Sequence, residues 1–220
     1  MTQTTPIPLP HPGSPTNHAT KQRPPQQPIR IGEGQYGGPM AITGPDTVVY
    51  RAARPEDAKA INGIDDSFST NTILTVTSTN DGFALKETPV TPPIHKQFPK
   101  DDDHPWGENP TDTIVAVANQ QVCGFVTTEY ETWNRRLTIV EIRVAPTHRG
   151  HGIGRALLNQ AIQRAREQGA GHVWLEVTNI NTPAIHLYRK AGFTFCGLDT
   201  SLYKNTESAT ETALFMTHPC

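Results

Sequence analysis

The stretch that decides the fold is VAPTHRGHGIGR, residues 144–155. An apolar, strand-like run ends at Val144, a turn with three glycines follows, and helical spacing of apolar residues begins directly after it. A strand, a glycine-rich turn and a helix in this order bring unpaired backbone N–H groups and the positive end of the helix dipole together. The stretch predicts an anion site. The alternative is that the glycines only allow a sharp turn and close packing of the helix on the strand.

Downstream of this turn, the sequence alternates between helix and strand patterns. Apolar residues at 158, 161, 162 and 165 share one helical face, and Gly169 ends this helix. A short apolar strand follows at 172–177, and Thr182-Pro183 begins a second helix that ends at 191. Two further strands are expected, at 194–197 leading into 201–203 and at 212–216.

Upstream of the turn, strand patterns dominate. Pro55 and two acids begin one early helix, expected over 55–65, and Asp81-Gly82 predicts a tight hairpin. Residues 92–112 are rich in Pro and Asp and predict a long surface loop. Strands first and then alternating helices and strands predict an α+β domain with a mixed sheet. The expected early strands are 48–52, 73–79, 83–88, 113–118, 122–128 and 137–144.

The first 45 residues differ in composition from the rest. They hold ten of the 20 prolines and few aromatic or branched apolar side chains, so they bury too little surface to offset their ordering entropy. We predict a disordered extension at 1–45 and one folded domain at 46–220. The domain has 16 basic and 20 acidic residues, which favours a cationic small molecule as partner. The alternative is that a net charge of this size only contributes to solubility.

Composition and spacing also argue against several classes of protein. The near balance of 19 basic and 21 acidic residues disfavours nucleic-acid binding. No membrane-length apolar run and no export or transit pattern occur, so we expect no membrane partner and a cytoplasmic protein. Three widely spaced cysteines predict reduced thiols, with Cys123 and Cys196 as packing residues. His148 and His151 have no third ligand nearby, so no metal site is expected, and Arg155 breaks the dinucleotide-binding pattern G-x-G-x-x-G.

Two motifs together resemble a known family. The run Arg149 to Gly154 is similar to the pyrophosphate loop [RQ]-x-x-G-x-[GA] of the GNAT N-acetyltransferases, which bind acetyl-coenzyme A. The pattern Asn179-x-Asn181, followed by Tyr188 and Gly192-Phe193, resembles the second signature of that family. The resemblance implies the GNAT fold, a mixed and mostly antiparallel sheet flanked by helices, and acetyl-coenzyme A as co-substrate.

Three further stretches narrow the resemblance. Residues 133–138, 174–179 and 196–203 are similar to the streptothricin (nourseothricin) N-acetyltransferases, resistance enzymes that acetylate an amine on the β-lysine part of the antibiotic. The resemblance covers about residues 47–219. It implies direct attack by the amine in a ternary complex. Another amine acceptor (a protein lysine, a polyamine or an aminoglycoside) and a module that binds acyl-coenzyme A without turnover are open alternatives, and so is a homodimer.

The resemblance also implies roles for residues around the turn. Tyr188 matches the general acid of the family, and the backbone of Val144 would bind the thioester. The alternative for Tyr188 is a core aromatic, because it shares an apolar helical stripe with Ala184, Leu187 and Ala191. The implied coenzyme-binding residues are Val144, Arg149, Gly150, His151, Gly152, Ile153, Gly154, Arg155, Asn179 and Asn181.

The acceptor amine is protonated at neutral pH and needs a base. Glu141 is our candidate, because many relatives carry an acid three residues before the loop strand ends, and alternation places it on the face opposite Ile142 and Val144. A polycationic acceptor also needs carboxylates and an aromatic face. For each of these residues the alternative is a solvated charge or, for the tryptophan, a turn anchor. The candidates are Asp65, Glu129, Glu131, Asp199 and Trp133.

Overall fold

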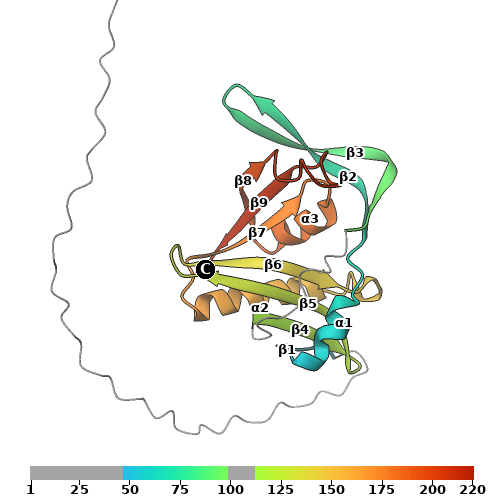
Figure 1. Cartoon of the computed structure of the whole chain (residues 1–220), viewed down its shortest axis with the longest axis vertical. Helices are drawn as coiled ribbons and strands as arrows, with labels where there is room; N and C mark the ends of the chain where they lie inside the picture. Colours follow the sequence, from blue (N-terminus) through green and yellow to red (C-terminus); the bar gives the residue numbers. More distant parts are fainter. Residues whose placement is uncertain (1–46, 99–111) are drawn as a thin grey trace, which may run out of the picture. The chain divides into compact units, whose positions relative to one another are not determined.

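The computed structural model describes residues 47–98 and 112–220 (Figure 1). The expected disordered extension at 1–45 and residues 99–111 of the expected loop at 92–112 lie outside the described residues. Within those two ranges, no helix is long and apolar enough to cross a membrane.

A seven-stranded sheet forms the centre of the domain, in the order β1-β4-β5-β6-β7-β9-β8 (Figure 1). Only the pair β6 and β7 is parallel, and every other neighbouring pair is antiparallel. The sheet is therefore mixed and mostly antiparallel, as predicted. Its strands are β1 (Val49–Ala52), β4 (Thr113–Ala118), β5 (Gln121–Glu131), β6 (Arg136–Val144), β7 (His172–Thr178), β8 (Thr194–Asp199) and β9 (Ala213–Pro219).

A separate two-stranded hairpin consists of β2 (Phe68–Thr79) and β3 (Gly82–Lys96). The predicted tight hairpin is present, with Asn80 and Asp81 as its turn residues and Gly82 opposite Thr79, but the strands are longer than expected. The prediction of a loop from residue 92 is wrong for the part up to Lys96. In a two-stranded ribbon each strand has an unpaired edge, so the prolines of β3 are tolerated without breaking an internal ladder.

Three helices accompany the sheet. A 3₁₀ turn at Pro55–Asp57 leads into α1 (Ala58–Asn62), which ends before Gly63 and is shorter than the expected helix over 55–65. The two later helices, α2 (Ile153–Glu167) and α3 (Thr182–Lys190), follow the predicted pattern. The predicted apolar stripe of α2 is buried, at Leu158, Ala161, Ile162 and Ala165.

The two faces of the sheet are covered differently. On the face that we call the helix face, α2 packs against β4 to β7 and against α3, and buried residues of both helices form one apolar cluster with Leu137 and Leu175. On the opposite face, which we call the α1 face, α1 packs against Val115 and Phe125 near the β1 end of the sheet. Side chains alternate along each strand, so the residues that flank the buried ones point to the α1 face.

The segment between β8 and β9 differs from the prediction. A strand was expected at 201–203, but residues 200–210 form turns. The Asp199 carboxylate accepts hydrogen bonds from the backbone N–H and the hydroxyl of Ser201, both at 2.6 Å, and these bonds fold the chain into a local turn. This turn segment carries Tyr203 back toward the sheet.

Candidate active site

The parallel strands β6 and β7 separate part-way along their length. They pair over Arg136–Ile139 and His172–Leu175, whereas β6 continues to Val144 and β7 to Thr178. The register of β5 against β6 shifts by one residue here, which leaves Val140 as an unpaired, exposed bulge residue. We call this region, residues 140–144 and 176–178, the fork.

The backbone at the end of β6 points into the fork. The N–H of Ala145 donates to the carbonyl of Cys123 on β5 at 2.9 Å. Hydrogen-bonding positions alternate along an antiparallel strand, so the neighbouring Val144 turns its N–H away from β5 and toward β7. This geometry leaves the Val144 N–H where it can serve a ligand carbonyl in the fork.

The glycine-rich turn has the geometry of an anion site. Gly150 and Gly152 have φ angles of 81° and 84°, and a Cβ at either position would have open space around it. The first hydrogen bond of α2 runs from the N–H of Ala156 to the carbonyl of Gly152 at 3.0 Å. The N–H groups of residues 153–155 therefore lack partners within the helix and stand next to open space, which fits a phosphate group.

Gly154 has a different role from the other two glycines. A Cβ there would lie 3.0 Å from a methyl carbon of Leu187 on α3, so this glycine allows α2 and α3 to approach closely. The packing alternative thus applies to Gly154. Of the remaining loop residues, Ile153 is buried, whereas His151 and Arg155 are exposed.

The Arg149 side chain forms hydrogen bonds within the protein. Its guanidinium donates to three backbone carbonyls, at Val144 (2.8 Å), Ser67 (2.6 Å) and Asp65 (2.7 Å). It ties the turn to the segment between α1 and β2, which favours a role in shaping the loop over a direct charge contact with phosphate.

Tyr188 lies in the core on the helix face. It is 7% exposed, and its ring centroid is 6.0 Å from that of Phe193. Burial, and secondarily the negative charge of Glu176, raises the pKa of the Tyr188 phenol. Among the described residues no group hydrogen-bonds this hydroxyl. The Tyr188 ring is thus part of the core, and its hydroxyl is protonated and free to donate a proton.

Both asparagines of the second motif use their side chains within the protein. Asn179 is buried, donates to the carbonyl of Leu74 on β2 and accepts from the N–H of Thr212, both at 2.8 Å. Asn181 caps α3 by accepting from the N–H of Ala184 at 3.2 Å. These contacts favour an indirect contribution to coenzyme binding.

Glu141 lies on the α1 face beside the fork. It pairs with Thr127 on β5, whereas Ile142 and Val144 pack on the core of the helix face, as the alternation predicted. Its carboxylate contacts the guanidinium of Arg143, which also reaches Asp66 at 3.4 Å. Burial raises the pKa of Glu141, Arg143 opposes that shift, and the charge of Asp66 adds to it.

Asp65, one of the predicted acceptor-binding acids, directly precedes Asp66, whose carboxylate lies near Arg143. The exposed Asp65 carboxylate accepts from the N–H of Ser67 at 2.8 Å, and this bond is the main reason why its pKa is lowered. The sequence analysis did not name Asp66, because its contact with Arg143 depends on the tertiary fold.

The remaining acceptor candidates lie elsewhere on the α1 face. Glu131 forms an ion pair with Arg136 and accepts from the indole N–H of Trp133 at 3.0 Å, at the far end of β6 from the fork. Trp133 is 83% exposed. Glu129 is exposed opposite Thr138, between that end and the fork, so Glu129 and Glu131 share a face as predicted.

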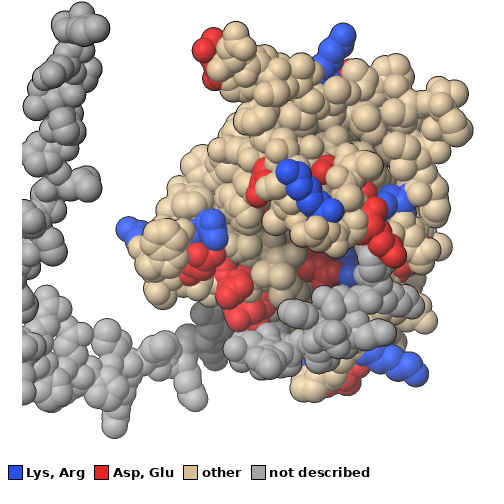
Figure 2. Space-filling model, turned by 45° about the horizontal axis from the view of Figure 1, so that its top comes forward, with Lys and Arg blue, Asp and Glu red and all other residues tan. Residues whose placement is uncertain are grey.

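Ion pairs of this kind are distributed over the surface. In Figure 2, Asp and Glu side chains lie beside Lys and Arg side chains at several places on the displayed face.

Cys123 is buried as expected, but the packing role predicted for Cys196 is wrong, because that thiol is exposed. In the part of the chain that the structure describes, no group of three His, Cys, Asp or Glu residues could hold a metal ion.

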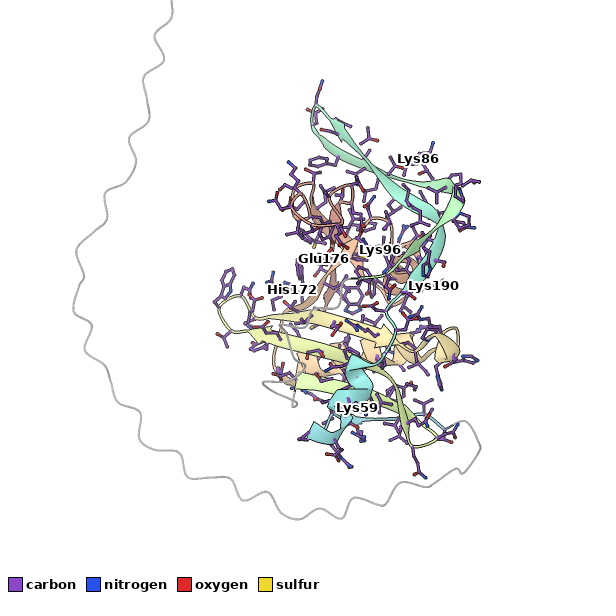
Figure 3. All side chains as sticks on the ribbon, turned by 45° about the vertical axis from the view of Figure 1, so that its right-hand side comes forward. Lys59, Lys86, Lys96, His172, Glu176 and Lys190 are labelled. Atoms are coloured by element: carbon purple, nitrogen blue, oxygen red, sulfur yellow. The ribbon has the colours of Figure 1, made fainter. Side chains whose placement is uncertain are left out.

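Sequence reasoning missed two residues beside the fork. Glu176 is the first β7 residue past the paired segment (Figure 3), and its carboxylate accepts from the hydroxyl of Tyr203. The available signal was the alternation of β7, in which buried Leu175 and Val177 leave Glu176 on the α1 face. Tyr203 was assigned to a strand, and nothing local indicates its contact.

Comparison with known proteins identifies the family of this arrangement. Residues 83–193 match the model of the "Acetyltransferase (GNAT) family". The chain belongs to the GNAT acetyltransferase family. Family membership explains the fork and the glycine-rich turn together, and it confirms the expected fold and the expected class of enzyme, an acetyl-coenzyme A-dependent N-acetyltransferase.

Within the GNAT family, this chain is similar to streptothricin acetyltransferases. It is 53% identical over 188 residues to the streptothricin acetyltransferase of Streptomyces lavendulae, which covers 82% of this chain and 100% of that relative. It also matches a crystal structure of nourseothricin acetyltransferase with a TM-score of 0.72 and 53% identity, over 79% of this chain and 98% of the other. The resemblance seen in the sequence is thereby confirmed.

A second similar solved structure contains the coenzyme. It is a protein described as a streptothricin acetyltransferase from Bacillus anthracis str. Ames in complex with acetyl coenzyme A. The TM-score is 0.68 and the identity 26%, over 80% of this chain and 99% of that chain.

Proposed function

We propose that this enzyme acetylates an amine on the β-lysine part of streptothricin and so inactivates the antibiotic. The observation that carries the proposal is the 53% identity to a streptothricin acetyltransferase over that relative's whole length. The fork supports it, because it places Glu141 on the α1 face and Tyr188 on the helix face of one opening between two strands.

The coenzyme would be held on the helix face. The N–H groups of residues 153–155, with Gly150 and Gly152 leaving space in front of them, would bind the pyrophosphate. The N–H of Val144 would bind the thioester carbonyl inside the fork. Arg149 would contribute by fixing the turn through its three carbonyl contacts.

When bound, acetyl-coenzyme A supplies an acetyl group activated as a thioester. Glu141 takes one proton from the acceptor ammonium, because alkyl amines have a pKa near about 10 and only the neutral amine has a free electron pair. The raised pKa of Glu141 makes this carboxylate a better base. Tyr188 donates its phenolic proton to the departing sulfur, and the amide nitrogen releases a second proton to solvent.

The acceptor would lie on the α1 face. Its positive groups are matched by carboxylates there, and Glu129 is the predicted candidate nearest the fork without a basic partner among the described residues. Glu131 and Trp133 form a second acidic and aromatic group at the far end of β6 and would serve a distant part of a long acceptor. Asp199 and Asp65 hold local turns and would add only to the negative field.

A thiol-release assay tests the proposal. Purified protein with acetyl-coenzyme A should release coenzyme A when nourseothricin is added and should not do so with spermidine, a histone peptide or kanamycin. Release only with one of those other amines would reject streptothricin as acceptor. Coenzyme binding by calorimetry without release for any amine would instead identify a non-catalytic module.

A further inference from the structure

A row of side chains crosses the α1 face at the fork. Thr127 on β5 pairs with Glu141 on β6, and Glu176 on β7 pairs with Phe215 on β9. The preceding row runs from Glu129 through paired neighbours on β6, β7 and β9. Since Glu141 and Glu176 both follow that row, they face each other across the point where β6 and β7 part.

The two acids have different partners. Glu141 contacts Arg143, so its charge is partly neutralised. Glu176 contacts the hydroxyl of Tyr203, and no Lys, Arg or His within residues 47–98 and 112–220 forms an ion pair with it. A hydroxyl fixes the direction of a carboxylate without cancelling its charge, so Glu176 keeps the capacity to bind a cation.

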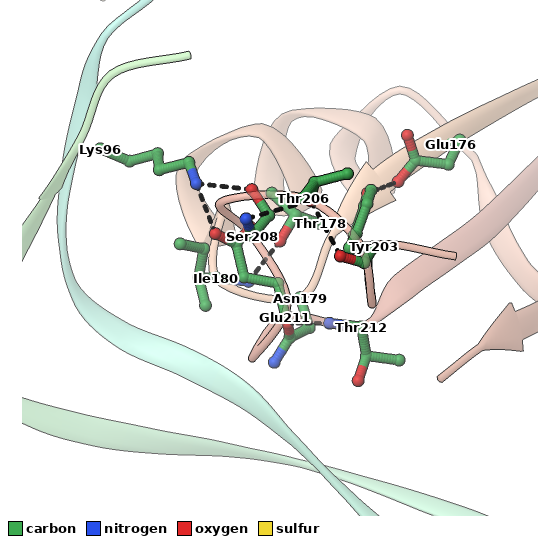
Figure 4. A network of polar contacts seen from close by, with 10 residues as sticks. All are labelled: Lys96, Glu176, Thr178, Asn179, Ile180, Tyr203, Thr206, Ser208, Glu211 and Thr212. Carbon is green, nitrogen blue, oxygen red and sulfur yellow. Dashed lines mark hydrogen bonds and ion pairs between the residues drawn. The ribbon is translucent and has the colours of Figure 1, made fainter. Parts of the chain in front are cut away.

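The turn segment that carries Tyr203 is bonded to two other elements (Figure 4). Lys96 at the end of β3 donates to Ser208 at 2.7 Å and to Glu211 at 2.5 Å, and Thr178 at the end of β7 donates to the other oxygen of Glu211 at 2.5 Å. These bonds tie the turn segment 200–212 to the hairpin and to β7. The segment that presents Tyr203 is therefore anchored at buried groups rather than free in solvent.

Aromatic rings lie beside Glu176. Phe215 is its cross-strand partner, and the Phe215 and Trp174 ring centroids are 5.1 Å apart. Glu176 itself remains accessible to solvent, as a residue that meets a substrate must be, although nearby protein atoms and the charge of Glu211 raise its pKa. The Arg136 guanidinium already lies 4.7 Å from the Trp174 ring centroid, so the Phe215 ring is the aromatic surface beside this accessible carboxylate that is offered to an alkylammonium group.

We infer that Glu176, oriented by Tyr203, binds a positive group of the acceptor and thereby holds the reacting amine over the fork opposite Glu141. The inference rests on the proposed function for its location, because the fork is taken as the place of transfer. Glu176 then acts as a specificity-determining residue and Tyr203 as a positioning residue. An acceptor with a second ammonium near the reacting amine is favoured over a simple monoamine.

The test is steady-state kinetics of Glu176→Gln with nourseothricin and acetyl-coenzyme A. The amide keeps the shape and removes the charge, so the KM for the antibiotic should rise between about 10-fold and 100-fold, with little change in the KM for acetyl-coenzyme A. Glu207→Gln is the matched control, since Glu207 is an exposed acid in the same turn segment, and its KM should stay within about twofold. An unchanged antibiotic KM in Glu176→Gln would overturn the inference.

Tyr203→Phe separates positioning from folding. Alone it should raise the antibiotic KM by several-fold, and in the Glu176→Gln background it should add nothing, because Tyr203 acts only by orienting a charge that this background lacks. Additive effects in the double variant would contradict the positioning role.

Direct calorimetric binding of nourseothricin to the coenzyme A-loaded protein separates this inference from the proposed function. If Glu176→Gln weakens binding but the wild-type protein shows no turnover, the binding role of Glu176 is supported and the proposed acetylation of streptothricin is rejected. If the wild-type protein turns over nourseothricin and Glu176→Gln binds it equally well, the proposed function is supported and the binding role of Glu176 is rejected. No binding to the wild-type protein would reject both.

Discussion

The two sides of the fork are built in different ways. On the helix face, the proposed coenzyme site consists of backbone groups from one continuous stretch, residues 144–155, with the Tyr188 hydroxyl beyond them. On the α1 face, the proposed acceptor site consists of side chains from β6, β7 and the turn segment 200–212. The first depends on local conformation and the second on register between distant segments. The predicted variants perturb one side at a time.

The largest effect is expected for the coenzyme side with Gly152→Asp. A carboxylate would enter the open space at the start of α2, and two like charges about 4 Å apart repel by about 4 kcal/mol at an effective dielectric constant of 20, or roughly 1000-fold in affinity. The affinity for acetyl-coenzyme A is measured by calorimetry. Gly169→Asp, at a φ of 72° beyond the other end of α2, carries similar backbone strain and should bind normally. Equal losses in both variants would indicate unfolding instead.

The next effect tests where the two sides meet. Tyr188→Phe should lower kcat by about 100-fold to 1000-fold and leave the affinity for acetyl-coenzyme A within about threefold, because only the donated proton is lost. The Tyr188 hydroxyl forms no hydrogen bond with another described residue, so the thermal midpoint should hardly change. A parallel loss of kcat, coenzyme affinity and stability would assign Tyr188 to packing alone.

Glu141→Gln tests the acceptor side and should lower kcat by about 100-fold. In the wild-type protein kcat/KM should fall as the pH drops through the raised pKa of Glu141, because the protonated carboxyl cannot accept a proton from the amine. This acidic limb should be absent in the variant. Glu129→Gln is the control, because Glu129 is an exposed acid on the same face, and this variant should keep the fall of kcat/KM at low pH. An identical pH profile in Glu141→Gln would exclude Glu141 as the base.

The smallest effect is expected for Trp133→Ala. Trp133 lies beyond the start of β6, whereas the fork begins at Val140 and ends at Val144, roughly 13 Å and 26 Å from Arg136 at about 3.3 Å per residue. Its exposed ring contacts Glu131 and no fork residue. The KM for nourseothricin should change by no more than about threefold. A tenfold rise would show that the acceptor site extends along the whole of β6.

The same contrast explains what the sequence could predict. The turn at 149–154, both later helices and most strands follow from local patterns of glycine, proline and apolar spacing. The side chain of Arg149 could not be placed, because its acceptors are backbone carbonyls at Asp65 and Ser67 that only the fold brings near.

The face of Glu141 shows the limit of pattern reasoning. Strict alternation from the buried Leu137 and Ile139 would place Glu141 on the helix face, whereas alternation counted from Val144 places it on the α1 face. The bulge at Val140 reconciles the two counts. A bulge shifts the pattern by one residue without a clear local signal. Glu176 and Tyr203 were missed for another reason, because their contact joins β7 to a turn segment that the sequence pattern assigned to a strand.

In the proposed arrangement, the coenzyme lies on the helix face and the acceptor on the α1 face, and the thioester and the reacting amine meet only within the fork. A crystal structure with coenzyme A and streptothricin bound together tests this most directly. We expect the sulfur on the helix-face side next to Tyr188 and the β-lysine amine on the α1 face, between Glu141 and Glu176. Both ligands on the same face of the sheet, or a β-lysine amine at the Trp133 end of β6, would contradict the account.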